Sequence, residues 1–273
     1  MTILVTGATG TVGRHLVAQL LAAGHPVRAL TRRPTEADLP DGVEVSAGNL
    51  TDLDSLVAAF AGVTAAHLIS FGDDYAPLRE ADRIVDLARQ AGVGRVSVLR
   101  GDITKGPLEV AVEASGLEWT HLSPVEFMSN TLEWAESIRA EGVVREAFPD
   151  ARSALIHEAD IAAVAAVALT TDGHAGQDYW LTGPQALTVP ERIERLSQVL
   201  GREIRYVELT TDEMVARWRA EGHSDDDIEF FLTMRTNPPE AGYTVLPTVE
   251  RITGRPARTF TDWVRDNAAT FQP

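Results

Sequence analysis

The fold class of this chain is decided by the stretch I-L-V-T-G-A-T-G-T-V-G, residues 3–13. Its first three residues are apolar and β-prone, which predicts a buried strand, and the apolar spacing that follows predicts an amphipathic helix. Between strand and helix, Gly7, Gly10 and Gly13 follow the spacing G-x-x-G-x-x-G. Glycines at such a turn allow a tight bend, close approach of a pyrophosphate and close packing of helix on strand. The stretch therefore predicts a dinucleotide-binding turn of the Rossmann type.

The start of the helix after this turn is the second part of the predicted cofactor site. Free N–H groups at a helix start favour phosphate binding. The alternative is a glycine-rich turn that binds nothing, which the surrounding strand–helix–strand pattern disfavours. We therefore assign cofactor binding to the loop residues Gly7, Thr9, Gly10, Thr11, Val12 and Gly13.

Two arginines, Arg32 and Arg33, follow the second predicted strand. NAD-specific folds usually carry an acidic residue at this place, where it accepts hydrogen bonds from the ribose hydroxyls. Guanidinium groups instead bind a 2′-phosphate, which a carboxylate would repel. The predicted cofactor is therefore NADP(H), and the alternative is a pair of solvated surface arginines.

Residues at the ends of the third and fourth predicted strands complete the cofactor site. Asn49 could reach the edge of the adenine, or it could be a turn residue, and both interpretations stay open. We assign to this part of the site Asn49, Leu50, Ser70 and Phe71.

Strand-like and helix-like segments alternate through the first two-thirds of the chain, the pattern of a parallel sheet covered on both faces. Predicted strands occupy residues 3–5, 27–30, 43–45, 66–70, 96–99 and 119–122, and predicted helices occupy residues 11–23, 51–60, 79–91 and 108–114. From about residue 171 the pattern changes to a short strand at 179–181 and to helices separated by proline and glycine. We predict an α/β fold, with a Rossmann-type doubly wound parallel sheet at residues 1–170 and a smaller, mainly helical C-terminal substrate lobe at residues 171–273.

Composition narrows the classes of function. The formal net charge of −16 disfavours nucleic acid and anionic membranes as partners. The absence of cysteine excludes disulfides, thiolate nucleophiles and Cys-ligated zinc, and the histidines show no metal-binding spacing. We therefore expect a small-molecule substrate and no metal, and the oligomeric state stays open.

Two features of the chain bear on its location. No basic leader with a cleavage site precedes the glycine turn. The longest strongly apolar run, residues 161–169, is too short to span a bilayer. We therefore expect a cytoplasmic protein.

The pair of Tyr and Lys four residues apart, typical of short-chain dehydrogenases, is missing, because Lys105 is the chain's sole lysine and no tyrosine precedes it at that spacing. Lys105 lies in the loop before the helix at 108–114. Near the nicotinamide it could bind the ribose or donate a proton to the reduced substrate. The alternative, a solvated loop lysine, carries equal weight. In the same loop Arg100 and Asp102 are expected to form an exposed ion pair.

Several ordered motifs resemble the NmrA-like group of atypical short-chain dehydrogenases/reductases. They are T-G-A-T-G-T-V-G at 6–13, S-G-L-E-W-T at 115–120, F-M-S-N at 127–130, I-H-E-A-D-I-A at 156–162, W-L-T-G-P at 180–184 and V-E-R-I-T-G-R-P-A-R at 249–258. The resemblance implies a Rossmann domain with a small substrate lobe that binds NADP(H).

The resemblance also implies roles for single residues. Isoflavone-reductase-like relatives carry a catalytic lysine at the offset that Lys105 has from Gly116, and in relatives the segment that contains Pro124 and Phe127 lies along the nicotinamide. The loop L-R-G-D at 99–102 departs from the serine-rich segment usual in the group. This departure removes a hydroxyl group from the loop after the fifth predicted strand.

Together these features predict an NADPH-dependent oxidoreductase that reduces a quinone, an enone or a similar flat carbonyl compound. Such a reduction could be a tailoring step in the synthesis of a natural product. Trp134, Phe148 and Trp218 could line an aromatic pocket, or they could fill the core of the second lobe. The alternative function, from a different class, is a non-catalytic NADP(H) sensor that acts through a protein partner. An epimerase or isomerase is a third possibility, which no residue specifically supports.

Overall fold

The computed structural model describes residues 2–72 and 76–272 of the chain. The chain folds into two compact units. The first unit consists of Met1–Pro124, Glu158–Leu181 and Thr248–Arg255. The second unit consists of Val125–His157, Thr182–Pro247 and Pro256–Pro273.

The first unit is built on a seven-stranded sheet in the order β3-β2-β1-β4-β5-β6-β8, in which all neighbours pair in parallel. The strands are β1 (Thr2–Val5), β2 (Val27–Thr31), β3 (Glu44–Ala47), β4 (Val63–Ile69), β5 (Arg95–Leu99), β6 (Glu118–Pro124) and β8 (Gln177–Leu181). The chain winds outward from β1 in one direction and from β4 in the other. The carboxyl ends of β1 and β4 therefore form the switch point at which open α/β sheets bind ligands.

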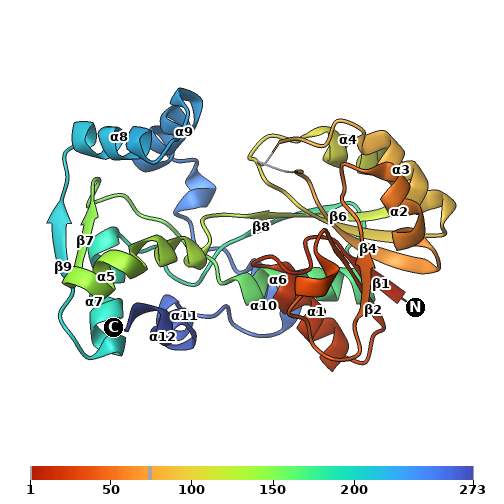
Figure 1. Cartoon of the computed structure of the whole chain (residues 1–273), viewed down its shortest axis with the longest axis horizontal. Coiled ribbons are helices and arrows are strands. Elements are labelled where there is room, and N and C mark those ends of the chain that lie inside the picture. Colours follow the sequence, from red (N-terminus) through yellow and green to blue (C-terminus); the bar gives the residue numbers. More distant parts are fainter. Residues whose placement is uncertain (1, 73–75, 273) are drawn as a thin grey trace. The chain divides into compact units, whose positions relative to one another are not determined.

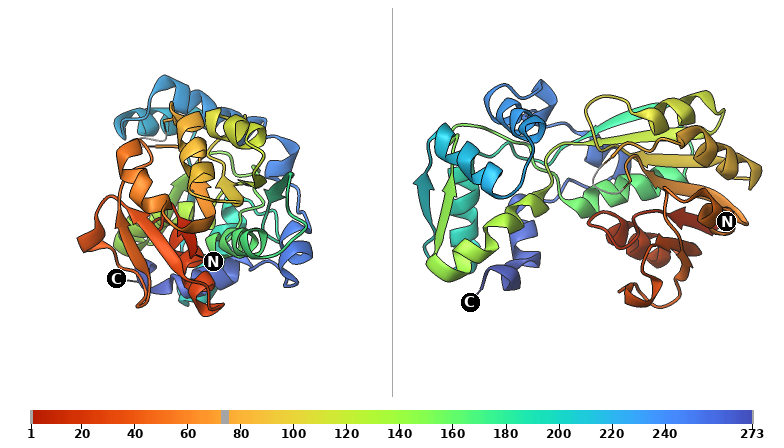
Figure 2. Two further views of the ribbon diagram at one scale, coloured as in Figure 1. Left: turned by 90° about the vertical axis from the view of Figure 1, so that its right-hand side faces the viewer. Right: turned by 45° about the horizontal axis from the view of Figure 1, so that its top comes forward.

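Helices cover both faces of this sheet, as Figure 1 and the two views of Figure 2 show. One layer contains α1 (Gly13–Ala22), α6 (Glu158–Thr170) and α10 (Thr248–Thr253), and the other contains α2 (Leu53–Phe60), α3 (Ala81–Gln90) and α4 (Pro107–Ala114). Leu68 of β4, Phe60 of α2 and Ile84 of α3 are buried together in the core under the second layer. The predicted doubly wound parallel sheet is confirmed.

The apolar run at residues 161–169 forms most of α6, which is buried along nearly its whole length. It packs against α1, where the side-chain amide of Gln19 donates a hydrogen bond of 2.9 Å to the carbonyl of Ala159. A helix that is apolar on all sides is expected in such a core position. Within residues 2–72 and 76–272, no helix is both long and apolar enough to cross a membrane.

The second unit contains a two-stranded parallel sheet of β7 (Val143–Glu146) and β9 (Arg205–Glu208). Its helices are α5 (Ala135–Glu141), α7 (Val189–Leu200), α8 (Thr211–Ala220), α9 (Asp225–Thr236), α11 (Phe260–Asp266) and α12 (Ala268–Phe271). Trp134 is buried in one apolar cluster of this unit, and Trp218 is buried in another, against which Phe148 packs. These three aromatic side chains thus fill cores, the second of the two roles expected for them.

The compact units do not follow the predicted boundary after residue 170. Strand β8, expected in the second lobe, pairs with β6 of the first unit, and residues 125–157 belong to the second unit. The difference arises because the chain passes between the units several times, whereas the sequence pattern was divided into two contiguous segments.

His67 lies in β4, at the centre of the sheet, and its side chain is fully buried. Its Nδ1 lies 2.8 Å from the Ser97 hydroxyl oxygen of β5. Burial lowers the pKa of His67 from 6.5 to about 4. The imidazole is therefore neutral in the folded protein at pH values where it is already charged in the unfolded chain.

We expect the free energy of unfolding to fall as the pH falls from about 6.5 to about 4, because His67 binds a proton in the unfolded state but stays neutral in the folded one. The pKa difference corresponds to roughly 3 kcal/mol from this residue. In His67→Asn, whose amide can replace Nδ1 toward Ser97, the slope of stability against pH should be shallower over this range. Urea unfolding at several pH values measures it, with His25→Asn as the matched control; equal slopes in both variants would contradict the assignment.

Candidate cofactor site

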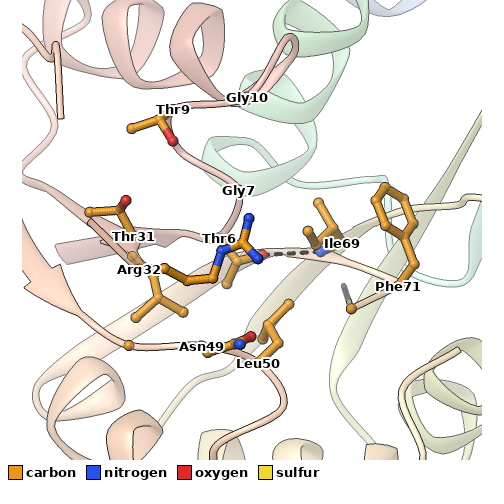
Figure 3. Close-up of a pocket in the computed structure, with 13 residues that line it drawn as sticks. Thr6, Gly7, Thr9, Gly10, Thr31, Arg32, Asn49, Leu50, Ile69 and Phe71 are labelled. Carbon is orange, nitrogen blue, oxygen red and sulfur yellow. Dashed lines mark hydrogen bonds between the residues drawn. The ribbon is translucent and has the colours of Figure 1, made fainter. Parts of the chain in front are cut away.

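A pocket of about 520 Å³ opens at the carboxyl edge of the first unit's sheet, around the switch point between β1 and β4. Figure 3 shows the residues that surround it. They come from the ends of β1, β2, β3 and β4 and from the loops that follow, and they are Thr6, Gly7, Thr9, Gly10, Leu30, Thr31, Arg32, Gly48, Asn49, Leu50, Ile69, Phe71 and Gly72. The structure thus brings together seven of the predicted cofactor residues: Gly7, Thr9, Gly10, Arg32, Asn49, Leu50 and Phe71.

The glycine turn is shaped by backbone contacts that exclude side chains. Gly7 has a φ of +60°, a conformation that favours glycine. A Cβ at Gly13 would overlap the carbonyl oxygen of Gly7 and lie 2.8 Å from the Cα of Ala8. Helix α1 therefore begins directly against the end of β1. The N–H groups of Arg14 and His15 donate to the carbonyls of Gly10 and Val12. The N-terminal end of a helix is a favourable place for a pyrophosphate, because the positive end of the helix dipole lies there.

Arg14, in the first turn of α1, is a residue that the sequence reasoning missed. Its Nη2 donates a 3.1 Å hydrogen bond to the carbonyl of Thr9, and its Nε donates a 3.3 Å hydrogen bond to the carbonyl of Gly10. These contacts brace the glycine loop from outside. The signal was available, because a cation in the first turn opposes the helix dipole and so calls for a specific reason.

The two arginines after β2 have different surroundings. Arg33 forms an exposed ion pair with Glu36 at 3.2 Å and does not line the pocket. Arg32 lines the pocket, and Figure 3 shows its side chain directed into the space between the glycine loop and Asn49. A guanidinium at this place suits the 2′-phosphate of NADP(H), so the pocket fits the predicted cofactor.

Asn49 combines the two roles that the sequence left open. Its Oδ1 accepts a 3.1 Å hydrogen bond from the N–H of Thr51, so it shapes the turn after β3, and it also lines the pocket. Leu30 and Leu50 contribute apolar surface beside it. An apolar wall with a few polar atoms is typical of a site for an adenine ring.

The end of β4 holds the opposite side of the pocket. The Thr6 hydroxyl donates to the carbonyl of His67 at 3.0 Å and accepts from the N–H of Ile69 at 3.1 Å, a bond drawn in Figure 3. Ser70 does not line the pocket; its hydroxyl accepts a 3.0 Å hydrogen bond from the N–H of Gly101. Ser70 therefore ties β4 to the loop after β5, while Phe71 lines the pocket.

The remaining predicted residues lie outside the pocket lining. Thr11 precedes α1, Val12 is its N-cap residue and Gly13 is its first residue. Lys105 lies in the loop between β5 and α4, where its ammonium donates a 2.6 Å hydrogen bond to Glu113 of α4. Pro124 is the last residue of β6.

The expectation of an exposed ion pair between Arg100 and Asp102 is wrong. The Arg100 side chain is only 4% exposed and donates to the Ser123 hydroxyl at 3.0 Å and to Asp178 at 3.2 Å. Asp102 instead accepts a hydrogen bond from the N–H of Thr104. The physical reason is that a buried guanidinium needs hydrogen-bond acceptors, and buried Ser123 of β6 and partly exposed Asp178 of β8 supply them.

Phe127 belongs to the second unit, where it precedes the 3₁₀ helix η3 (Met128–Trp134) and forms an isolated parallel bridge with Ile156. The neighbouring Glu126 makes a bidentate ion pair with buried Arg192 at 3.0 and 3.1 Å. Burial alone would raise the pKa of Glu126, but the charge and hydrogen bonds of Arg192 lower it to about 2. The backbone that carries Phe127 is therefore firmly anchored within its unit.

The comparisons with known proteins agree with this geometry. A family model described as NAD(P)H-binding matches residues 7–103. The chain is 40% identical to a (4-alkanoyl-5-oxo-2,5-dihydrofuran-3-yl)methyl phosphate reductase of Streptomyces griseus, over 99% of both chains. It is 35% identical to an NAD(P)H azoreductase of Xenophilus azovorans, over 98% of this chain and 99% of the relative.

A solved structure shares the whole fold. It is an NADPH-dependent quinone oxidoreductase from Escherichia coli complexed with NADPH, with a TM-score of 0.79, 25% identity, and coverage of 97% of this chain and 99% of that one. The chain belongs to the NAD(P)H-binding, NmrA-like family of atypical short-chain dehydrogenases/reductases. It is an NAD(P)H-dependent reductase of this family, and NADP(H) is its cofactor.

We expect Arg32→Ser to raise the KM for NADPH by about 10- to 100-fold, because a charge-assisted bond to the 2′-phosphate is lost. The KM for NADH, which lacks this phosphate, should stay nearly unchanged. Arg33→Ser is the matched control, since Arg33 pairs with Glu36 at the surface. Steady-state kinetics with both cofactors measure the effect; equal losses in the two variants would show that Arg32 does not read the phosphate.

Proposed function

We propose that this reductase transfers hydride from NADPH to a small, flat, conjugated acceptor such as a quinone, an enone or a similar carbonyl compound. The observation that carries the proposal is the 40% identity, over 99% of both chains, to a reductase whose named substrate has a ring double bond conjugated to carbonyl groups. The named azo and quinone reductases act on other flat, conjugated systems. Tailoring of a natural product fits this substrate class.

Residues of the first unit would hold the cofactor. NADPH, when bound, supplies the hydride. The N–H groups of Thr11, Val12 and Gly13, at and just before the start of α1, would hold the pyrophosphate, and Arg32 would hold the 2′-phosphate. Asn49 and its apolar neighbours would hold the adenine. The carboxyl edge of the parallel sheet, where these groups meet, is the general site of catalysis in open α/β folds.

Lys105 is the proposed acid. After hydride reaches the acceptor, the Lys105 ammonium donates a proton to the resulting anion and then recovers a proton from water, to which 46% of its side chain is exposed. Pro124, the last residue of β6, would provide apolar surface for the nicotinamide side of the site. Reduction of a quinone gives a stabilised anion that needs little acid catalysis, which suits a site without the usual tyrosine. The small-molecule chemistry and the NADPH requirement fit a cytoplasmic location.

We expect oxidation of NADPH, followed at its absorbance band, with at least one acceptor from a panel of quinones, α,β-unsaturated lactones and azo compounds. Lys105→Ala should lower kcat with an enone by about 100-fold, because a positioned acid is lost. The loss with a quinone should be much smaller. Lys105→Arg is the matched variant, because it keeps the charge but releases no proton.

A protein that turns over no acceptor in the panel, yet distinguishes the oxidised from the reduced cofactor in its affinity, would contradict the proposal and favour a sensor. If the wild-type protein reduces an acceptor and Lys105→Ala has the same kcat, the protein is a reductase in which Lys105 is not the acid.

A further inference from the structure

The loop that carries Lys105 is exposed but held at almost every residue. The N–H of Gly101 donates to Ser70, and the Nη2 of Arg100 donates a 2.5 Å hydrogen bond to the carbonyl of Ile103. Asp102 accepts a 3.0 Å bond from the N–H of Thr104. Such a loop loses little conformational freedom when a ligand binds, which is a property of preorganised sites.

Two carboxylates one helical turn apart on α4 hold the end of this loop. Glu109 is buried, and its Oε2 accepts a 3.1 Å hydrogen bond from the N–H of Gly106. Glu113 accepts the 2.6 Å hydrogen bond from the Lys105 ammonium. The first carboxylate therefore fixes the backbone next to Lys105, and the second fixes the charged end of its side chain.

His121, which lies next to Glu113, does not neutralise the Glu113 carboxylate, so this charge stays available to Lys105. His121 of β6 is fully buried, and its Nδ1 lies 3.6 Å from the Glu113 oxygen that Lys105 contacts, too far for a hydrogen bond. Burial lowers the pKa of His121; the nearby Asp178, Glu113 and Glu109 oppose this shift and Arg100 adds to it. A neutral imidazole does not compete with Lys105 for the carboxylate.

We propose that Glu113 is a positioning residue for the reduction, one that holds the Lys105 ammonium in a single orientation against α4. The inference rests on the proposed role of Lys105 as the acid. A lysine side chain that is 46% exposed would otherwise sample many rotamers, and this conformational freedom would have to be lost in the transition state. The carboxylate of Glu113, 29% exposed, removes that freedom before the substrate arrives.

The kinetic test is a double-mutant cycle with an enone as the acceptor. Glu113→Gln should lower kcat by about tenfold or more while the KM for NADPH stays unchanged, as expected for a group that acts through another. In the Lys105→Ala background, the same substitution should change kcat by no more than about twofold. Glu80→Gln, which removes an exposed partner of Arg83 on another helix, is the matched control. An unchanged kcat in Glu113→Gln, or an equal loss in both backgrounds, would overturn the proposal.

A second readout does not need turnover. Lys105 is the sole lysine, so an amine-acylating reagent modifies only this side chain and the N-terminal amine, which mass spectrometry separates. Glu113→Gln should speed acylation of Lys105 by about two- to fivefold, because the negative charge that pairs with the ammonium is lost. Glu80→Gln should not. If the wild-type protein reduces no acceptor, the proposed function fails while this rate still reports on Glu113; a rate unchanged by Glu113→Gln overturns the positioning role.

Discussion

The contact between the start of α1 and the carbonyl of Gly7 is the constraint on which the cofactor site depends. Because a Cβ at Gly13 has no room there, the helix begins directly at the end of β1. That approach places the N-terminal end of α1 at the switch point between β1 and β4. Any side chain at Gly13 would push the helix away, and the dipole of α1 would no longer act on a phosphate at close range.

The charge of the molecule raises a second question, since a chain with a net charge of −16 binds a polyanionic cofactor. Screening limits the reach of exposed charges to about 8 Å at physiological ionic strength, so the field at a phosphate depends on nearby groups. Arg32 lines the pocket, and Arg14 lies on the loop carbonyls of Thr9 and Gly10. We therefore expect local arginines and backbone N–H groups, rather than the net charge of the chain, to determine the affinity for the cofactor.

Much of the first unit could be predicted because its sequence signals are local. The glycine turn and the strand–helix alternation depend on neighbouring residues, and Gly7, Gly10 and Arg32 do meet in one pocket. The contacts that were missed are long-range. Strand β8 pairs with β6 across an intervening segment of the second unit, and β7 and β9 have only four residues each, with mixed polarity. Arg100 was misjudged because its acceptor, Asp178, lies 78 residues away in sequence.

The structure gives a physical reason for the altered loop after β5, one that depends on contacts distant in sequence. A serine-rich segment could offer hydroxyl groups near the cofactor, and Arg100 in its place removes that chemistry. Arg100, just after β5, instead contacts Ser123 near the end of β6 and Asp178 near the start of β8, and it fixes the loop through the carbonyl of Ile103. Since a buried guanidinium without these acceptors would be strongly destabilising, the loop has one favourable path. In the proposed mechanism, a single lysine in this loop, held by a carboxylate, would provide the proton donor where the usual Tyr–Lys pair is absent.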